Sequence, residues 1–396
     1  RSLNLREELL GKTHIDYSKS LNNLASVFVE LGQLDKAEPL YLESLGIREQ
    51  TVGVESSDYA KVLYNLSGLY HEIGDLERAE LRGIEAKEIR EQVLGKDHEH
   101  YASSLINLAN ISYETNNFER ALALYLEAKA ILEKQEYLPF YSYVATLDNL
   151  GAIHEQLGKF VEAETFYDRA AELRLQVFGE DTENYALTLN HLASVYKHTD
   201  RLAEAEQALQ QALAILERLG MNSTTTYAYS LQDLSDVNQS LGRLEDAQEL
   251  QEQAIGILGQ HLQKYHPRYL RSLRSMAQLK QERGQNESAA TLLRELAQVE
   301  EKTLANAVRH MTEAELANFT RDFERNLFQY FALAEADPSI ADVCYDKILL
   351  YKGFLQTKAL ELRQLAQSNE AIQTYFQALR QLHIELGQLY TAADQS

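Results

Sequence analysis

Cysteine, tryptophan and basic residues are scarce in this sequence. The only cysteine among the 396 residues is Cys344, so internal disulfides are excluded and a reducing, cytoplasmic location is expected. No apolar run approaches the roughly 18 residues of a membrane-spanning helix, which argues against a membrane protein. With 38 basic against 60 acidic residues the net charge is −22, so nucleic acid is not expected as a direct partner.

Catalytic and metal-binding motifs are also missing. The sequence contains no G-x-x-x-x-G-K-[ST], G-x-G-x-x-G, H-E-x-x-H or G-x-S-x-G. His98 and His100 lack a third ligand at a fitting spacing, so they make a weak metal site. Cys344 has apolar neighbours and is interpreted as a buried structural thiol. We therefore expect no catalytic residues, no bound metal and no cofactor.

One pattern returns every 42 residues. Each copy opens on a tyrosine, has leucine four residues later, then an apolar and a small residue, and reaches an alanine twelve residues beyond the small one. The tyrosines are Tyr17, Tyr59, Tyr101, Tyr143, Tyr185, Tyr227 and Tyr269, and the alanines are Ala37, Ala79, Ala121, Ala163, Ala205, Ala247 and Ala289. Seven copies in one register identify a repeat array.

Each copy is predicted to form two helices. In the first copy Tyr17, Leu21, Ala25 and Phe28 lie on one face of a helix with 3.6 residues per turn. A residue type that tolerates the left-handed conformation then ends the helix: Gly32, Gly74, Asn116, Gly158, Asp200, Gly242 and Gly284. Small residues let helix axes approach closely, and one pair cannot bury its apolar face alone. The expected fold is therefore an all-α solenoid.

These features resemble the tetratricopeptide repeat (TPR), and the 42-residue length, with L-N-N-L-A at Leu21–Ala25 and A-E-P-L-Y at Ala37–Tyr41, is similar to the kinesin light chain type. Leucine replaces the tryptophan common in the motif, and the closing proline is missing. The resemblance implies a right-handed superhelix. We predict the second helix of a truncated repeat at 1–16, seven repeats at 17–310 and a helical cap or connector at 311–396. Because 1–16 is only half a repeat and begins with Arg1 instead of Met, more sequence is expected before it.

A second pattern lies on the first helices, about a third of a turn from the packing residues. The resemblance implies that this face lines a concave groove in which Lys and Asn hold a bound peptide or protein segment. The candidate groove residues are Lys19, Asn23, Lys61, Asn65, Asn107, Asn149 and His191. An Asn amide can donate to and accept from a peptide backbone, and Lys supplies a positive charge. The alternative is that the asparagines bridge neighbouring first helices.

A basic cluster occurs in the seventh copy. Arg271 and Arg274 belong to the candidate groove, and Lys264, Arg268, Lys280 and Arg283 surround them. In so acidic a chain the cluster is suited to an acidic segment of a partner or of the same protein. The alternative is a solvated face that balances nearby carboxylates.

The C-terminal region resembles a second family. Three long helices are expected there, at Thr312–Ala336, at Ile340–Gln367 and at Ala371–Leu389. The stretch Tyr345–Arg363, with Lys352-Gly353 between apolar runs, resembles the connector before the caspase-like peptidase domain of TPR-CHAT proteins. The resemblance implies a non-enzymatic, partner-recruiting part of such a protease, with the downstream peptidase domain as a possible partner. The alternative is a stand-alone TPR scaffold or a kinesin-light-chain-like cargo adaptor.

Overall fold

The computed structural model describes residues 2–264 and 266–307 of the chain. Contacts divide the chain into two compact units, Arg1–Ile257 and Leu258–Ser396. The three helices expected beyond residue 311, and Cys344 with them, lie outside the described residues.

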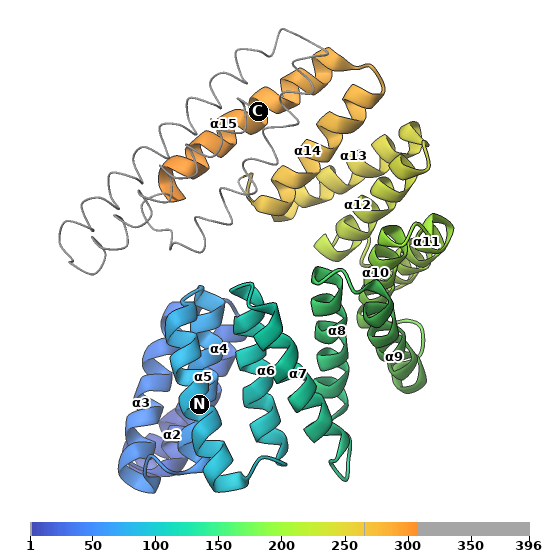
Figure 1. Cartoon of the computed structure of the whole chain (residues 1–396). Coiled ribbons are helices and arrows are strands. Elements are labelled where there is room, and N and C mark those ends of the chain that lie inside the picture. Colours follow the sequence, from blue (N-terminus) through green and yellow to red (C-terminus); the bar gives the residue numbers. More distant parts are fainter. Residues whose placement is uncertain (1, 265, 308–396) are drawn as a thin grey trace, which may run out of the picture. The chain divides into compact units, whose positions relative to one another are not determined.

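Every regular element in the described residues is an α-helix, which confirms the predicted all-α class (Figure 1). The helices are α1 (Ser2–Leu10), α2 (Ile15–Glu30), α3 (Leu34–Val52), α4 (Ser57–Ile73), α5 (Leu76–Leu94), α6 (Glu99–Glu114), α7 (Phe118–Glu133), α8 (Phe140–Gln156), α9 (Phe160–Phe178), α10 (Glu183–His198), α11 (Leu202–Arg218), α12 (Thr225–Ser240), α13 (Leu244–His261), α14 (Pro267–Glu282) and α15 (Asn286–Ala307). Helix α13 crosses the boundary between the two units.

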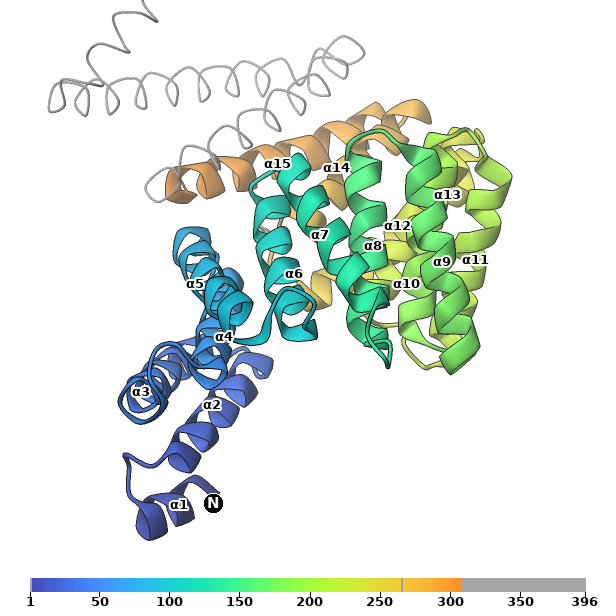
Figure 2. The ribbon, with the colours of Figure 1, turned by 60° about the horizontal axis from the view of Figure 1, so that its bottom comes forward.

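The helices of the first unit form stacked helix–turn–helix pairs. In the five pairs from α2–α3 to α10–α11 the two helices pack along their length, and the second helix of each also packs on the first helix that follows it (Figure 2). Successive first helices contact one another as well, whereas successive second helices lie further apart. The first helices therefore form the inner wall of the stack, as the TPR resemblance implies. In the second unit α14 and α15 form a pair of the same kind.

The repeating apolar residues form the core of each pair. The seven alanines are 0% exposed, and the seven leucines are at most 7% exposed: Leu21, Leu63, Leu105, Leu147, Leu189, Leu231 and Leu273. Burying one such leucine contributes about 1.5–3 kcal/mol to the free energy of unfolding. At Gly151 a Cβ atom would lie 2.6 Å from the Tyr167 ring, which explains why the small position is glycine in that copy.

The turn inside each pair has the predicted backbone. All seven residues that were expected to end the first helices have positive φ, including Asn116 at 57° and Asp200 at 62°. At Gly32 the amides of Gly32 and Gln33 donate back to carbonyls of the preceding helix, which closes the helix end.

The first helices begin before the tyrosines, because a polar residue three positions earlier caps them. Ser56, Thr182 and Thr224 accept a hydrogen bond from the tyrosine amide at 3.2–3.3 Å. His14 and His98 use Nδ1 to accept from the amide two residues later, at 3.1 and 3.0 Å. Such caps satisfy amides that the helix itself leaves unpaired.

Candidate functional site

The inner wall of the first unit presents the two candidate positions of each first helix. Lys19 and Asn23 on α2 and Lys61 on α4 are exposed, and Asn65 is half-buried. Residues four apart lie on one side of a helix, so each lysine neighbours the asparagine of its own repeat. The inner wall therefore carries exposed cationic and amide groups at its N-terminal end.

Three of the asparagines contact the preceding first helix. The Asn65 Nδ2 atom donates to Asn22 Oδ1 at 2.9 Å, and Asn149 Nδ2 lies 3.5 Å from Asn110 Oδ1. The Ser67 hydroxyl lies 2.7 Å from Asn107 Oδ1. Asn65, Asn107 and Asn149 therefore bridge neighbouring first helices, as the structural alternative expects.

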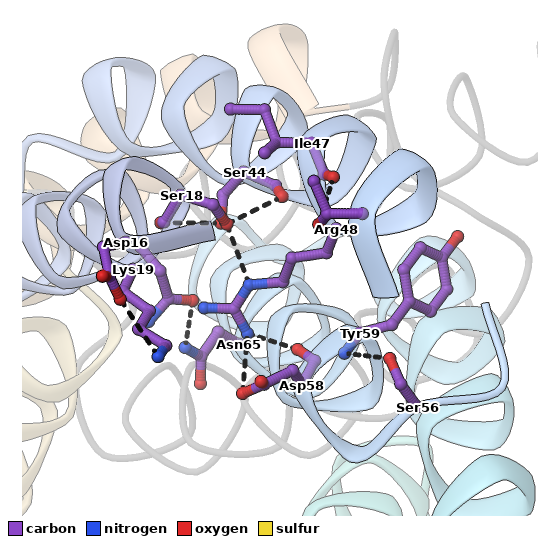
Figure 3. Close-up of polar contacts among 12 residues, drawn as sticks. Asp16, Ser18, Lys19, Ser44, Ile47, Arg48, Ser56, Asp58, Tyr59 and Asn65 are labelled. Carbon is purple, nitrogen blue, oxygen red and sulfur yellow. Dashed lines mark hydrogen bonds and ion pairs between the residues drawn. The ribbon is translucent and has the colours of Figure 1, made fainter. Parts of the chain in front are cut away.

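Unlike Asn65, Asn107 and Asn149, the side chains of Lys19, Lys61 and Asn23 form no bridge between first helices in the described part of the chain. The Lys19 ammonium lies 3.2 Å from Asp16 Oδ1, an exposed pair within one helix (Figure 3). Within the described residues Lys61 makes no ion pair and the Asn23 side chain makes no hydrogen bond. Because exposed pairs such as Lys19–Asp16 contribute little to stability, these three side chains are available to a ligand without loss of core contacts.

His191 takes the asparagine position in the fifth copy. Its side chain is exposed and its ring centroid lies 5.0 Å from that of Tyr167 on α9. The inner wall surrounds the ring with protein atoms, and this desolvation lowers the pKa of His191 although the ring remains open to solvent; Asp148 and Glu155 oppose the effect. The neutral imidazole carries one donor and one acceptor, like the amide it replaces.

A column of arginines that the sequence analysis did not single out joins successive repeats. Arg6, Arg48, Arg90 and Arg174 recur at multiples of 42 residues near the ends of the second helices, and Leu132 takes the place between the last two. Arg6 Nη1 donates to Asp16 O at 2.9 Å, and Arg90 Nη1 donates to His100 O at 2.8 Å. Each arginine thus reaches the first helix of the following repeat.

Arg48 shows the same contact at the N-terminal end of the wall (Figure 3). From α3 its Nε donates to Ser18 Oγ at 2.9 Å, and its Nη1 donates to the carbonyl of Asp58 on α4. Burial lowers the pKa of Arg48 and lowers that of Arg90 to about 10. Both remain cationic near neutral pH, and the Nη1 group of each donates to a backbone carbonyl oxygen, whereas Arg90 Nε is buried without a partner among the described residues. The arginine column is therefore part of the scaffold that positions the inner wall.

The two histidines considered for metal binding serve to begin α6. His98 is the N-cap residue, and its ring lies 5.0 Å from that of His100, whose pKa is lowered by burial. No group of three His, Cys, Asp or Glu side chains suited to a metal occurs in the described part of the chain. Among the described helices, none is long and apolar enough to cross a membrane.

The basic cluster lies in the second unit. Arg271 and Arg274 are on α14, where Arg271 is exposed and Arg274 is half-buried. Lys264 and Arg268 are exposed near the start of this helix, and Lys280 is half-buried near its end. These residues make α14 a basic helix in an acidic chain.

The family model of the tetratricopeptide repeat matches residues 1–50, 18–87, 58–134 and 143–218, which together exceed half of the chain. No curated protein matches the chain. A STAND protein with a tetratricopeptide repeat sensor from Pyrococcus horikoshii is 18% identical and has a TM-score of 0.57, covering 80% of this chain and 46% of that one.

Two other solved structures belong to the same comparison. A Rap protein complexed with competence and sporulation factor is 13% identical, with a TM-score of 0.53, covering 86% of this chain and 99% of that one. A putative kinesin light chain from Podosopora anserina is 24% identical, with a TM-score of 0.44, covering 52% of this chain and 98% of that one. For the STAND and Rap proteins, whose TM-scores exceed 0.5, the likeness is one of fold. By its repeats, its stacked helix pairs and the family match, the chain belongs to the tetratricopeptide repeat family.

Proposed function

We propose that the chain is a non-enzymatic protein-interaction module that holds an extended segment of a partner along the inner wall of 2–257. The observation that carries the proposal is the exposed set Lys19, Asn23 and Lys61 on successive first helices. An extended segment exposes backbone donors and acceptors along its length, and amide side chains complement both.

The bridging asparagines can contribute to partner binding as well as to the packing of the first helices. Asn65 uses its Nδ2 for the contact with Asn22, which leaves its half-buried carbonyl oxygen as an acceptor for a ligand amide. A side chain whose rotamer is already fixed loses little conformational entropy on binding. The same residues therefore serve the stack and present oriented groups to a partner.

Charge favours a partner segment that carries carboxylates near the N-terminal end of the wall. Lys19 and Lys61 are exposed there, in a protein of net charge −22. Opposite charges on the partner would speed association more than they would raise affinity. One structural neighbour, the Rap protein, is complexed with competence and sporulation factor, which is consistent with an interaction role for this fold.

A peptide-display selection tests the proposal. The full chain is used to select random twelve-residue peptides, and the best peptide is titrated against wild type and against Asn23→Ala/Lys61→Ala. We expect the double variant to bind at least about ten-fold more weakly, because two ligand contacts are lost. Equal affinities for both proteins, at equal thermal stability, would place the binding site elsewhere.

For the wider context we propose the partner-recruiting part of a CHAT-family peptidase. This rests only on the resemblance of Tyr345–Arg363, which lies outside the described residues, and no comparison above bears on it. A stand-alone scaffold or a kinesin-light-chain-like cargo adaptor is the alternative, and the single cysteine supports a cytoplasmic location in either case. The coding sequence after Ser396 distinguishes the two, because a caspase-like domain with one His and one Cys at strand ends belongs only to the first.

A further inference from the structure

Exposed apolar side chains gather at one loop of the first unit. The loop between α7 and α8 contributes Tyr137 and Leu138, which are 83% and 41% exposed, the first turn of α8 contributes Tyr141, at 72%, and the end of α9 contributes Val177 and Phe178, at 54% and 44%. We call these five residues the aromatic patch. Contiguous exposed apolar surface of this kind is typical of interaction sites.

Two rings of the patch, those of Tyr141 and Phe178, pack together with the ring of Phe140. The Tyr141 and Phe178 rings lie 5.7 Å apart, and Phe140, half-buried beneath them, lies 5.3 Å from Phe178 in an edge-on arrangement. Pro139 begins α8 with its φ fixed at −71°, which limits the conformations of the loop. The rings are therefore presented in a defined arrangement and would lose little freedom on binding.

The patch is a local departure from the repeat. Three of the equivalent loops are polar, with Gly-Lys-Thr-His at 11–14, Gly-Lys-Asp-His at 95–98 and Gly-Glu-Asp-Thr at 179–182, and the loops at 53–56 and 220–224 carry one apolar side chain each, Val54 and Met221. Those loops connect second helices to first helices as the α7–α8 loop does. The aromatic side chains are therefore not needed to make this connection.

The charged residues around the patch favour a partner that carries positive charge. Lys134 is paired with Asp97 at 2.9 Å, and Arg218 is paired with Asp181 at 2.6 Å. Glu136 directly precedes Tyr137 and Glu180 lies two residues after Phe178, and both carboxylates are exposed and make no ion pair within the described residues. The rim is therefore left with unpaired negative charge, and the open tyrosine rings can also receive cations on their faces.

We propose that the aromatic patch docks a segment of a partner protein in which apolar side chains alternate with lysine or arginine. Apolar residues cover the exposed rings while the cations pair with Glu136 and Glu180. A second copy of this chain fits less well, because it would bring the same carboxylates together across the contact. The patch shares no residue with the candidate groove, so the proposal does not depend on the proposed peptide groove.

Two fluorescent peptides test the proposal with the full chain. Both contain the same phenylalanine and leucine residues, separated by lysine in one and by glutamate in the other, and binding is measured by fluorescence anisotropy. We expect the lysine peptide to bind at least about ten-fold more tightly than the glutamate peptide. Tyr137→Ser/Tyr141→Ser should weaken its binding by about ten-fold or more, whereas Val54→Ser, a change at an apolar loop residue that is 46% exposed, should not.

Charge reversal supplies a second test that does not remove the rings. Glu136→Lys/Glu180→Lys should weaken binding of the lysine peptide and strengthen that of the glutamate peptide, because the rim then has the opposite sign. The proposal is overturned if Tyr137→Ser/Tyr141→Ser binds the lysine peptide as wild type does, or if only Asn23→Ala/Lys61→Ala abolishes binding. It is also overturned if sedimentation shows a dimer that Tyr141→Ser dissolves, since a second copy would then occupy the patch.

Discussion

At the scale of single residues, tyrosine occupies two opposite environments in the first unit. Tyr101 is 3% exposed and packs with Leu105 and Leu132 in one core cluster, whereas Tyr137 is 83% exposed in the α7–α8 loop. Both were visible in the sequence, but only Tyr101 stands in the 42-residue register. Position in the 42-residue register therefore distinguishes a tyrosine that packs in the core from one that is exposed.

We predict that Tyr101→Ala lowers the free energy of unfolding by about 3 kcal/mol or more, as aromatic truncations in cores do. Tyr137→Ala is the matched control and should change it by no more than about 0.5 kcal/mol, as expected for a surface site. Denaturant unfolding of the three proteins measures both values. A near-neutral result for Tyr101→Ala would show that the tyrosine column contributes little to packing.

Acid is expected to destabilise the protein through histidines whose pKa is lowered in the folded chain by desolvation. His154 stacks on Phe166 with ring centroids 5.3 Å apart, and burial lowers its pKa although Glu162 opposes this. The unfolded chain, with a His pKa of about 6.5, then binds a proton more readily than the folded chain. Stability should therefore fall as the pH drops through about 6.5 towards the folded-state pKa of His154.

The change His154→Gln tests this origin, because glutamine does not titrate. We expect the variant to lose less stability than wild type when thermal unfolding is compared at neutral and mildly acidic pH. The remaining loss comes from His100 and His191, whose pKa values are also lowered by burial. Identical pH dependence in the two proteins would show that His154 does not contribute.

At the scale of elements, the turn between paired helices depends on a left-handed residue. Asn116 ends α6 with φ at 57°. We predict that Asn116→Ala costs about 1 kcal/mol, since a Cβ without a polar group is disfavoured there. Asn116→Gly should be neutral or slightly stabilising at this position. The thermal unfolding midpoints of the two variants test whether Asn116→Gly is more stable than Asn116→Ala. Equal stability of the two variants would contradict the prediction.

The arginines of the column connect one helix pair to the next through hydrogen bonds. Arg90 Nη1 donates to His100 O and to Ser104 Oγ, both at 2.8 Å, from a side chain that is 4% exposed. We predict that Arg90→Ala lowers the free energy of unfolding by about 2 kcal/mol or more, because it removes two buried hydrogen bonds and the packing of a large buried side chain. Arg90→Leu should cost less, since Leu132 and Leu216 fill the corresponding place in other copies. A larger loss for Leu than for Ala, measured by denaturant unfolding, would contradict this account.

The helix pairs could be predicted from the sequence because leucine, small residues and alanine hold one register through seven copies. The arginine column was harder to detect, because arginine is usually a surface residue and Leu132 and Leu216 interrupt its spacing. The capping position varies among His, Ser and Thr, so its shared role emerges only from the hydrogen bonds. Packing is encoded by repetition of similar side chains, whereas polar contacts are made by different residue types in different copies.

At the scale of the whole molecule, the inner wall combines a scaffold with a candidate binding surface. Sequence placed Asn65, Asn107 and Asn149 on one face but left open whether they bridge helices or bind a partner, because both roles require the same exposed amide. The structure shows the bridges. Asn23 and Lys61 make no such contact among the described residues, so changing both alters the surface of the inner wall without altering the bridges.

The measurement that tests the account most directly is a pull-down from the source cell lysate with three baits, with bound proteins identified by mass spectrometry. The baits are wild type, Asn23→Ala/Lys61→Ala and Asn65→Ala/Asn107→Ala, each first shown to be folded. We predict that a protein captured by wild type is lost from Asn23→Ala/Lys61→Ala, which keeps the bridges. Equal capture by wild type and Asn23→Ala/Lys61→Ala would contradict binding along the inner wall. This holds whether or not Asn65→Ala/Asn107→Ala still captures the protein.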